Sequence, residues 1–277
     1  MRSTIALLLI ATLASPVLAQ SAGPAPGGGT GTSPGSTPGV STMPTDLDLP
    51  LEKPMFVAPP QPAPTPDDGD RDDPRDEPPP VIYGEEIISE TDTIVYVVDI
   101  SCSMDWDNRS YTTLDGQTRT GNRMARAKVE LSRSILGLSR NFTFTVIAYD
   151  CGTRTWSRQL KEANDSNKSS AVAWVNALQP TGATGTGPAV SLGLQVSREN
   201  KSVVLLTDGA PNCGVPEDNN WYNYSESAVL NAHRRMIRNA NSQGATINVF
   251  GIAASGTYRT FCQNVAADAS GSYFDVP

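Results

Sequence analysis

The sequence predicts an α/β fold in which a largely parallel sheet is covered by helices on both faces. From residue 81 onward, apolar β-branched segments alternate with amphipathic segments of helical period, as in βαβ architectures. The segment 94–98 (IVYVV) is apolar on both faces, which is typical of a central strand buried between two helical layers. A region rich in proline and glycine precedes this pattern, so we expect one folded domain, residues 81–277, behind a spacer.

The folded region divides into alternating helices and strands. Apolar residues at helical spacing predict a helix at 123–138, after a long polar loop at 104–122. Further helices are expected at 169–178, 188–199, 225–243 and 257–269. Strands are expected at 141–150, 202–207, 245–253 and 272–276, with a short antiparallel edge strand at 153–160.

The first 80 residues carry two segments that fall outside this fold. Residues 1–19 combine Arg2, an apolar core at 5–13 and a Val-Leu-Ala end, which is the pattern of a secretory signal peptide cut after Ala19. Residues 20–80 hold sixteen of the 22 prolines and an acidic run, and such a stretch buries too little apolar surface to fold. No later apolar run approaches the roughly 18 residues that span a bilayer. We therefore expect a disordered spacer and an exported protein, secreted, periplasmic or at the cell surface, with no transmembrane segment.

Charge and cysteine content narrow the function classes. The formal net charge of −8 argues against nucleic acid as a partner. After export, the four cysteines are expected to form disulfides, and three pairings of Cys102, Cys151, Cys213 and Cys262 are open. A zinc site is the alternative, but the chain has one histidine and no C-x-x-C pair.

Oxygen-bearing side chains follow two of the expected strands and one glycine-rich turn. Asp99, Ser101 and Ser103 come at alternate positions directly after the strand at 94–98. Open α/β sheets place ligands there, at the carboxyl ends of their strands. Carboxylate and hydroxyl oxygens are ligands for Mg²⁺ or a similar hard cation. Thr184 in GATGTGPAV and Asp208 in LLTDG carry two further oxygens in later motifs.

These three motifs, in this order, resemble the metal-ion-dependent adhesion site of the von Willebrand factor type A (VWA) family. The likeness covers residues 91–276. It departs from the family pattern at two positions that are usually glycine, Cys102 between the serines and Ala183 before the threonine. The resemblance implies a doubly wound, mostly parallel six-stranded sheet in which the fourth parallel strand lies next to the first.

The same resemblance implies roles for the five oxygen-bearing residues. Ser101, Ser103 and Thr184 would bind the ion through their hydroxyls. Asp99 and Asp208 would act directly or through water. The implied ion is Mg²⁺, with Mn²⁺ or Ca²⁺ as alternatives, and an acidic side chain from a protein or matrix ligand would complete its shell.

The implied sheet order also suggests how the cysteines pair. In that order, the strand before Cys102 neighbours the strand before Cys151, and the strands that precede Cys213 and Cys262 are neighbours as well. Neighbouring strands lie about 4.8 Å apart, within the Cα separation that a disulfide needs. We therefore expect the disulfides Cys102–Cys151 and Cys213–Cys262.

The expected function is an exported, non-enzymatic binding or adhesion module that captures a protein or matrix ligand through a divalent ion. The alternative is a structural or assembly component of an envelope or extracellular complex, whose ion site only stabilises the fold. A metal-dependent hydrolase is less favoured, because Ser101 stands where a phosphatase of the haloacid dehalogenase type needs a second aspartate. No G-x-S-x-G motif is present, and the glycines of GATGTG do not match a dinucleotide-binding fingerprint.

Overall fold

The computed structural model describes residues 78–209, 211–219 and 225–277. The expected signal peptide and nearly all of the expected spacer lie outside the described residues. Pro80 is buried, and its carbonyl accepts a hydrogen bond from the Ile87 amide at 2.7 Å. Pro80 is therefore already packed on the folded domain.

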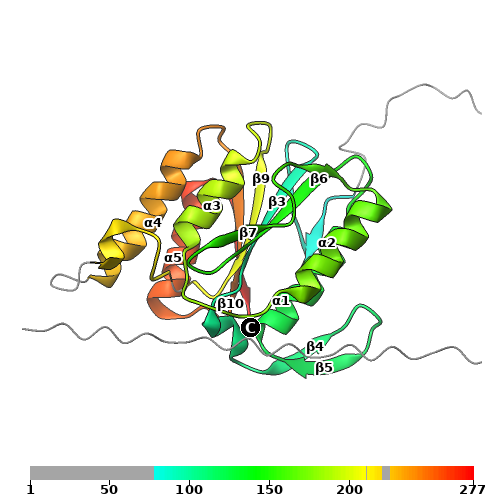
Figure 1. Cartoon of the computed structure of the whole chain (residues 1–277), viewed down its shortest axis with the longest axis horizontal. Helices are drawn as coiled ribbons and strands as arrows, with labels where there is room; N and C mark the ends of the chain where they lie inside the picture. Colours follow the sequence, from blue (N-terminus) through cyan, green and yellow to red (C-terminus); the bar gives the residue numbers. More distant parts are fainter. Residues whose placement is uncertain (1–77, 210, 220–224) are drawn as a thin grey trace, which may run out of the picture. The chain divides into compact units, whose positions relative to one another are not determined.

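A seven-stranded, mostly parallel sheet forms the centre of the domain (Figure 1). Its order is β11-β10-β9-β3-β6-β7, and the short β8 pairs with another part of β6. Neighbours are parallel from β11 to β6, whereas β7 and β8 run antiparallel to β6. The bounds are β3 (Thr93–Asp99), β6 (Thr143–Tyr149), β7 (Thr153–Thr155), β8 (Lys161–Glu162), β9 (Ser202–Thr207), β10 (Thr246–Ile252) and β11 (Tyr273–Val276). The expected fold class is confirmed. The sheet has seven strands rather than the expected six, because β8 also pairs with β6, and the strand beside β3 is the third parallel strand, β9, rather than the fourth.

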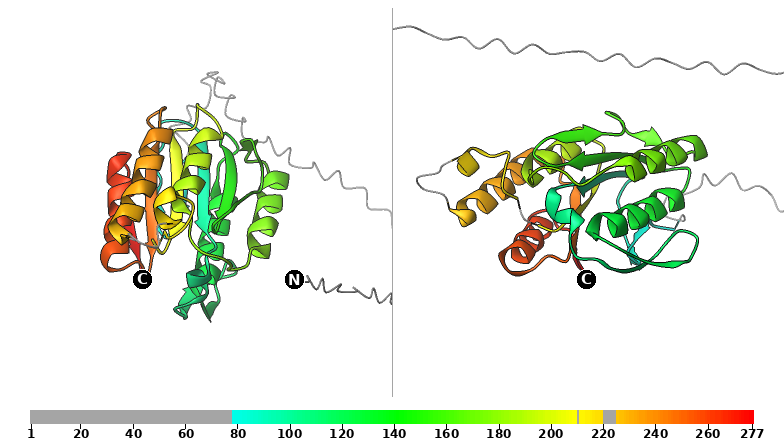
Figure 2. Two further views of the ribbon diagram at one scale, coloured as in Figure 1. Left: turned by 60° about the vertical axis from the view of Figure 1, so that its left-hand side comes forward. Right: turned by 60° about the horizontal axis from the view of Figure 1, so that its bottom comes forward.

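Five helices cover the two faces of this sheet (Figure 2). They are α1 (Arg123–Gly137), α2 (Asp165–Ala177), α3 (Thr186–Gln195), α4 (Glu226–Ala240) and α5 (Gly256–Asp268). Buried residues of α1 and α2 join one hydrophobic cluster, and buried residues of α3, α4 and α5 join another, while Val229 and Ala232 of α4 lie in a small third cluster. Along β3, Tyr96 and Val98 belong to the first cluster and Val95 and Val97 to the second. Period-two alternation thus explains why this strand is apolar at every position.

Two small hairpins were not expected from the sequence. Strands β1 (Val81–Ile82) and β2 (Glu85–Glu86) pair antiparallel before the main sheet begins. The segment expected to be a loop at 104–122 instead contains β4 (Arg109–Thr112) and β5 (Thr118–Gly121), also antiparallel. Its turn is closed by the Thr113 amide, which donates to the Gln117 carbonyl at 2.8 Å, and Gly116 has a φ of 81°. The pair Asp115-Gly116 at this turn is a sequence signal for a hairpin. Its flanking strands are polar and lack the apolar alternation that would have made the signal clear.

The carboxyl ends of the parallel strands meet at one edge of the sheet. After β3 the chain enters a short 3₁₀ helix, η2 (Cys102–Asp105), then the β4–β5 hairpin, and then α1. After β9 it passes through a second 3₁₀ helix, η3 (Pro216–Asn219), before α4. The hairpin lies at the lower side of the sheet in Figure 1, close to the end marked C. This edge is where the candidate ligand residues are found.

Candidate metal centre

Asp99 is the last residue of β3 and is completely buried. Its Oδ1 accepts a hydrogen bond from the Ser101 amide at 2.8 Å. Its Oδ2 accepts from the Thr207 hydroxyl at 2.7 Å and from the Tyr149 hydroxyl at 3.3 Å. The carboxylate therefore ties the ends of β6 and β9 to the turn after β3 and sets the direction of that turn.

The two serines of the first motif are brought together by the start of η2. Ser101 is extended, with a φ of −61° and a ψ of 162°, and the 3₁₀ turn begins at the next residue. As a result the hydroxyl oxygens of Ser101 and Ser103 lie 3.1 Å apart. Ser101 is buried and Ser103 is partly exposed, so this pair of oxygens faces from the interior toward the surface.

The turn that carries Thr184 is fastened to the first motif through its backbone. The Cys102 amide donates to the Gly182 carbonyl at 3.0 Å, and the Thr181 amide donates to the Ile100 carbonyl at 2.6 Å. The Thr184 amide donates to Oδ1 of Asn212 at 2.8 Å, and the Asn212 amide returns a bond to the Thr184 carbonyl at 2.9 Å. Asn212 is a positioning residue that sequence reasoning missed.

Asp208 follows β9 directly and is 5% exposed. Its Oδ2 accepts a hydrogen bond from Nη1 of Arg123 at 2.9 Å. Its Oδ1 is buried and has no hydrogen-bond partner among the described residues. A buried carboxylate oxygen without a donor is costly, so it is a position at which a cation or a water molecule would stabilise the protein.

Burial and mutual repulsion affect the protonation of this pair of carboxylates. Burial, and after it the nearby negative charge of Asp208, raises the pKa of Asp99 to about 7. Hydrogen bonds from Ser101 and Thr207 oppose this rise. The ion-free site thus holds more negative charge than the surrounding protein readily solvates, which is the condition that a divalent cation relieves.

The structure brings the motifs of all five predicted site residues to one edge of the sheet. No group of three or more His, Cys, Asp or Glu side chains that could hold a metal occurs within the described ranges, so a site here depends on hydroxyls. The candidate ligands fit the preference of Mg²⁺ for hard oxygen ligands. They are two buried carboxylates, one of which has an oxygen without a donor among the described residues, and three hydroxyl-bearing side chains. Asp99, Ser101, Ser103, Thr184 and Asp208 are the residues that would hold such an ion, directly or through water.

The cysteines pair differently from expectation. The structure contains a disulfide between Cys151 and Cys213, with Cα atoms 5.7 Å apart, whereas Cys102 is free and exposed and Cys262 is free and buried. The predicted pairs Cys102–Cys151 and Cys213–Cys262 are therefore both wrong. Strand order was a poor guide, because Cys213 is bonded to the turn at Thr184 and Cys262 is buried within α5.

The turn at Thr184 explains which cysteines meet. The Cys213 amide donates to the Thr184 carbonyl at 3.2 Å, and the Gly185 amide donates to the Asp150 carbonyl at 2.8 Å. A Cβ on Gly185 would lie 2.9 Å from the Asp150 carbonyl oxygen, so the close approach of these loops requires glycine. The disulfide therefore joins two loops that both contact the turn at Thr184 and Gly185.

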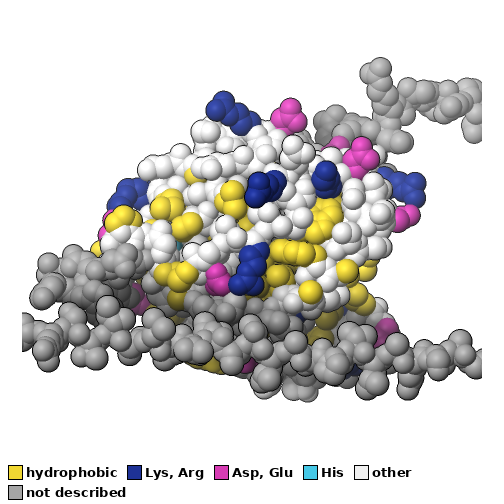
Figure 3. Space-filling view, in the orientation of Figure 1, with side chains coloured by type: hydrophobic (Ala, Val, Ile, Leu, Met, Phe, Trp, Pro, Cys, Tyr) yellow, Lys and Arg dark blue, Asp and Glu magenta, His cyan; other side chains and the backbone are white. Residues whose placement is uncertain are grey.

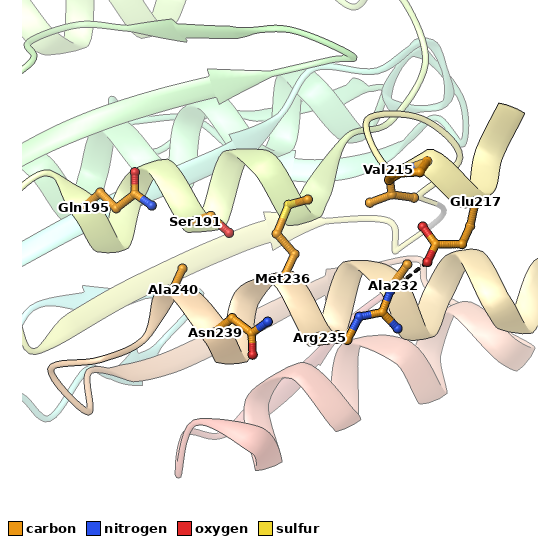
Figure 4. A pocket seen from close by; sticks show the side chains of 10 residues that line it. Ser191, Gln195, Val215, Glu217, Ala232, Arg235, Met236, Asn239 and Ala240 are labelled. Carbon is orange, nitrogen blue, oxygen red and sulfur yellow. Dashed lines mark hydrogen bonds and ion pairs between the residues drawn. The ribbon is translucent and has the colours of Figure 1, made fainter.

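Two of the cavities formed by the described residues are large enough for a small molecule and lie away from these oxygens. One, of about 470 Å³, lies between α3, α4 and the segment that enters η3 (Figure 4). It has amide side chains and an Arg235–Glu217 ion pair around an apolar floor, and it is lined by Ser191, Gln195, Val215, Pro216, Glu217, Ala232, Arg235, Met236, Asn239 and Ala240. The other, of about 680 Å³, lies between α1 and the β4–β5 hairpin. Neither is lined by any of the five candidate ligand residues.

Comparison with known proteins identifies the fold. No family model and no curated protein matches the chain. Among solved structures, a von Willebrand factor type A protein from Catenulispora acidiphila is 20% identical, with a TM-score of 0.49 over 69% of this chain and 40% of that one. The pilus adhesin SpaC from Lactobacillus rhamnosus GG is 18% identical, with a TM-score of 0.51 over 68% and 28% of the two chains. The PilB minor pilin from Streptococcus sanguinis is 17% identical, with a TM-score of 0.50 over 70% and 59%.

The fold is VWA-like. In the sheet, β9 lies beside β3, and β7 runs antiparallel at the β6 edge, where the sequence pattern predicted an edge strand. The matched region spans 40% of the Catenulispora protein, 28% of SpaC and 59% of PilB. Within the described residues, no helix combines the length and apolarity that crossing a membrane requires.

Proposed function

We propose that this chain is an exported, non-enzymatic binding module that captures an acidic group of a protein or matrix ligand through a divalent cation, Mg²⁺ first among the candidates. The observation that carries the proposal is the buried, orphaned Oδ1 of Asp208, at the same edge as the paired hydroxyls of Ser101 and Ser103. Such a site would hold the ion with few direct carboxylates. The ion would then remain electrophilic and attract a carboxylate from a partner.

Two further observations support binding rather than catalysis or nucleic-acid recognition. SpaC is described as a pilus adhesin and PilB as a minor pilin. By this likeness, we propose adhesion or assembly at a cell surface for this chain as well. On the face drawn in Figure 3, basic and acidic side chains are scattered rather than gathered into one basic stripe. Phosphate backbones favour a concentrated basic surface, so this face lacks the pattern typical of nucleic-acid binding.

Isothermal titration of the full exported chain with Mg²⁺, Mn²⁺ and Ca²⁺ tests the ion site. We expect saturable binding of one ion per chain, lost in the Asp208→Ala variant. Asp165→Ala is the matched control, because Asp165 is an exposed aspartate whose ion pair with Arg140 lies at the start of α2. Absence of binding by any of the three ions would refute the metal centre.

Adhesion is tested on immobilised collagen, fibronectin and fibrinogen with Mg²⁺ or with EDTA. Retention that EDTA abolishes, while circular dichroism shows the fold intact, supports ligand capture through the ion. Ion binding that raises thermal stability without any retention would instead favour the assembly component. Turnover of a phosphate ester that requires the ion and Asp99 would establish the hydrolase alternative.

A further inference from the structure

Arg123 is the first residue of α1 and lies within reach of two carboxylates. Its Nη1 donates to Asp208 Oδ2 at 2.9 Å, and its Nε lies 4.0 Å from Asp107 Oδ2. The side chain is 16% exposed, and its Nε has no hydrogen-bond partner among the described residues. The guanidinium therefore binds the candidate ion ligand with one end and has an unused donor near the second carboxylate.

Asp107 is held in place by two other arginines. Its Oδ1 lies 3.0 Å from Nε of Arg109, and its Oδ2 lies 3.2 Å from Nη2 of Arg126. Arg126 also donates to the Asp107 carbonyl at 3.2 Å. Asp107 has a φ of 60°, in the left-handed region, which aspartate enters more readily than most other non-glycine residues. Asp107 is thus a fixed acceptor beside the start of α1, held there by its ion pairs with Arg109 and Arg126.

Electrostatics makes the contact of Arg123 with Asp208 dependent on the ion. With Arg123 on Asp208, the guanidinium offsets part of the negative charge of Asp99 and Asp208. A divalent cation near Asp208 would repel this guanidinium at short range and compete with it for the carboxylate. Asp107 offers the displaced guanidinium a nearby acceptor, so Arg123 would not have to enter water.

We propose that Arg123 is an internal counter-cation of the candidate metal centre, which holds Asp208 in the ion-free protein and shifts to Asp107 when the divalent ion binds. This inference rests on the proposed metal-dependent function and concerns the regulation of the same site. It assigns Arg123 the role of weakening ion affinity and Asp107 the role of restoring part of it. The two residues are therefore expected to change ion binding in opposite directions.

The test is titration of Mg²⁺ into the full chain with variants on each side of the pair. Arg123→Ala removes the competing cation, and we expect Mg²⁺ to bind about fivefold more tightly, as for loss of a partly buried charge contact. Arg123→Lys keeps the positive charge and should return the affinity toward that of the unaltered protein. Asp107→Asn removes the alternative acceptor and should weaken Mg²⁺ binding about threefold, because Arg123 is then retained by Asp208.

Arg133→Ala is the matched control, since Arg133 lies on α1 and pairs with Glu130 rather than with the site. A merely structural role for Arg123 predicts weaker binding together with a lower melting temperature in Arg123→Ala, and that result overturns the inference. Unchanged affinity in both Arg123→Ala and Asp107→Asn also overturns it, while leaving the metal centre intact.

The titration also separates this inference from the proposed function. If neither the unaltered protein nor Arg123→Ala binds Mg²⁺, both fail together. If Mg²⁺ binds only after Arg123→Ala, the inference is supported in its strongest form and the unaltered protein is not a metal-dependent binder. Tighter binding in Arg123→Ala and weaker binding in Asp107→Asn support both.

Discussion

At the scale of single residues, the two buried carboxylates are used differently. Both oxygens of Asp99 accept hydrogen bonds from the protein, from Ser101, Thr207 and Tyr149. One carboxylate oxygen of Asp208 accepts a hydrogen bond from Arg123, and the other has no donor among the described residues. Asp99 therefore organises the turn that presents the hydroxyls, whereas Asp208 has an oxygen available for an ion or for water.

Removing either carboxylate should weaken the ion site. We expect Asp99→Ala and Asp208→Ala each to lower Mg²⁺ affinity at least tenfold, about 1.4 kcal/mol or more, with the fold retained. Isothermal titration measures the affinity, and circular dichroism with a thermal melt verifies the fold. If both variants bind Mg²⁺ as tightly as the unaltered protein does, the assignment of the site is wrong.

The pKa of Asp99 predicts how the ion-free protein responds to pH. Folding raises this pKa to about 7 from about 4 in the unfolded chain, so the folded state holds the proton more tightly between these values. The stability that the proton contributes is fully present below about pH 4 and is lost as the pH rises through about 7. In EDTA, the melting temperature should therefore fall across this window relative to that of Asp99→Asn, which cannot titrate.

Differential scanning fluorimetry at several pH values measures this difference. Added Mg²⁺ should raise the melting temperature more at pH 8 than at pH 5, because the ion competes with the proton for the site. A constant difference between the two proteins from pH 4 to pH 8 would show that Asp99 does not titrate in this range.

At the scale of elements, one turn is held from several sides. The segment that leads into α3 is bonded to the loop after β3, to the loop after β6 and to the loop after β9. The disulfide Cys151–Cys213 joins the last two of these loops. Thr184 owes its position to contacts among loops that are distant in sequence, and its motif alone does not explain that position.

Breaking this disulfide should affect both stability and ion binding. It closes a loop with a sequence separation of 62, for which chain-entropy estimates predict about 4 kcal/mol of stabilisation. We expect the double variant Cys151→Ser/Cys213→Ser to have a lower melting temperature and weaker Mg²⁺ binding, because Thr184 loses a constraint. Thermal melts and titration measure the two effects.

The free cysteine Cys102 provides the control for this prediction. Cys102→Ser changes an exposed side chain in the first motif without removing a cross-link, so its melting temperature should stay close to that of the unaltered protein. Peptide mapping of the unreduced chain should recover Cys151 linked to Cys213. Recovery of Cys102 linked to Cys151 would instead restore the pairing expected from strand order.

At the scale of the whole molecule, the sheet is buried on both faces by helices. Within the described residues, the hydrophobic clusters on the two faces consist of residues from 82–276, and Pro80 is already buried. Stability of the domain is therefore expected to come from this region, and the proline-rich composition of residues 20–77 predicts no contribution to a core.

Deletion of residues 20–77 should leave the melting temperature of the domain nearly unchanged. A segment that buries little apolar surface contributes little to the free energy of unfolding. Calorimetry of the shortened and full chains measures the difference. A fall of several degrees, which corresponds to about 1 kcal/mol or more in a domain of this size, would mean that part of the segment packs on the domain.

The sequence by itself determined the fold class and the main strands and helices, and it proposed the residues of the candidate centre. Strands such as β3 and β9 are continuous apolar runs, and their carboxyl ends carry Asp99 and Asp208, so local pattern and position within a parallel sheet were enough. Helix α2 begins earlier than expected, at Asp165, because the side chain of Asn164 caps it by accepting from the Asn167 amide at 2.9 Å.

Only the tertiary structure decided the cysteine pairing and the partners of Arg123 and Asn212. The disulfide and the contacts Thr184–Asn212 and Arg123–Asp208 join residues that lie between 28 and 85 positions apart, through loops whose paths leave no periodic signal in the sequence. A strand fixes the direction of its side chains every two residues, so its buried face can be read locally. A loop has no such period, and its course depends on the closest backbone approaches that neighbouring loops allow, as at Gly185.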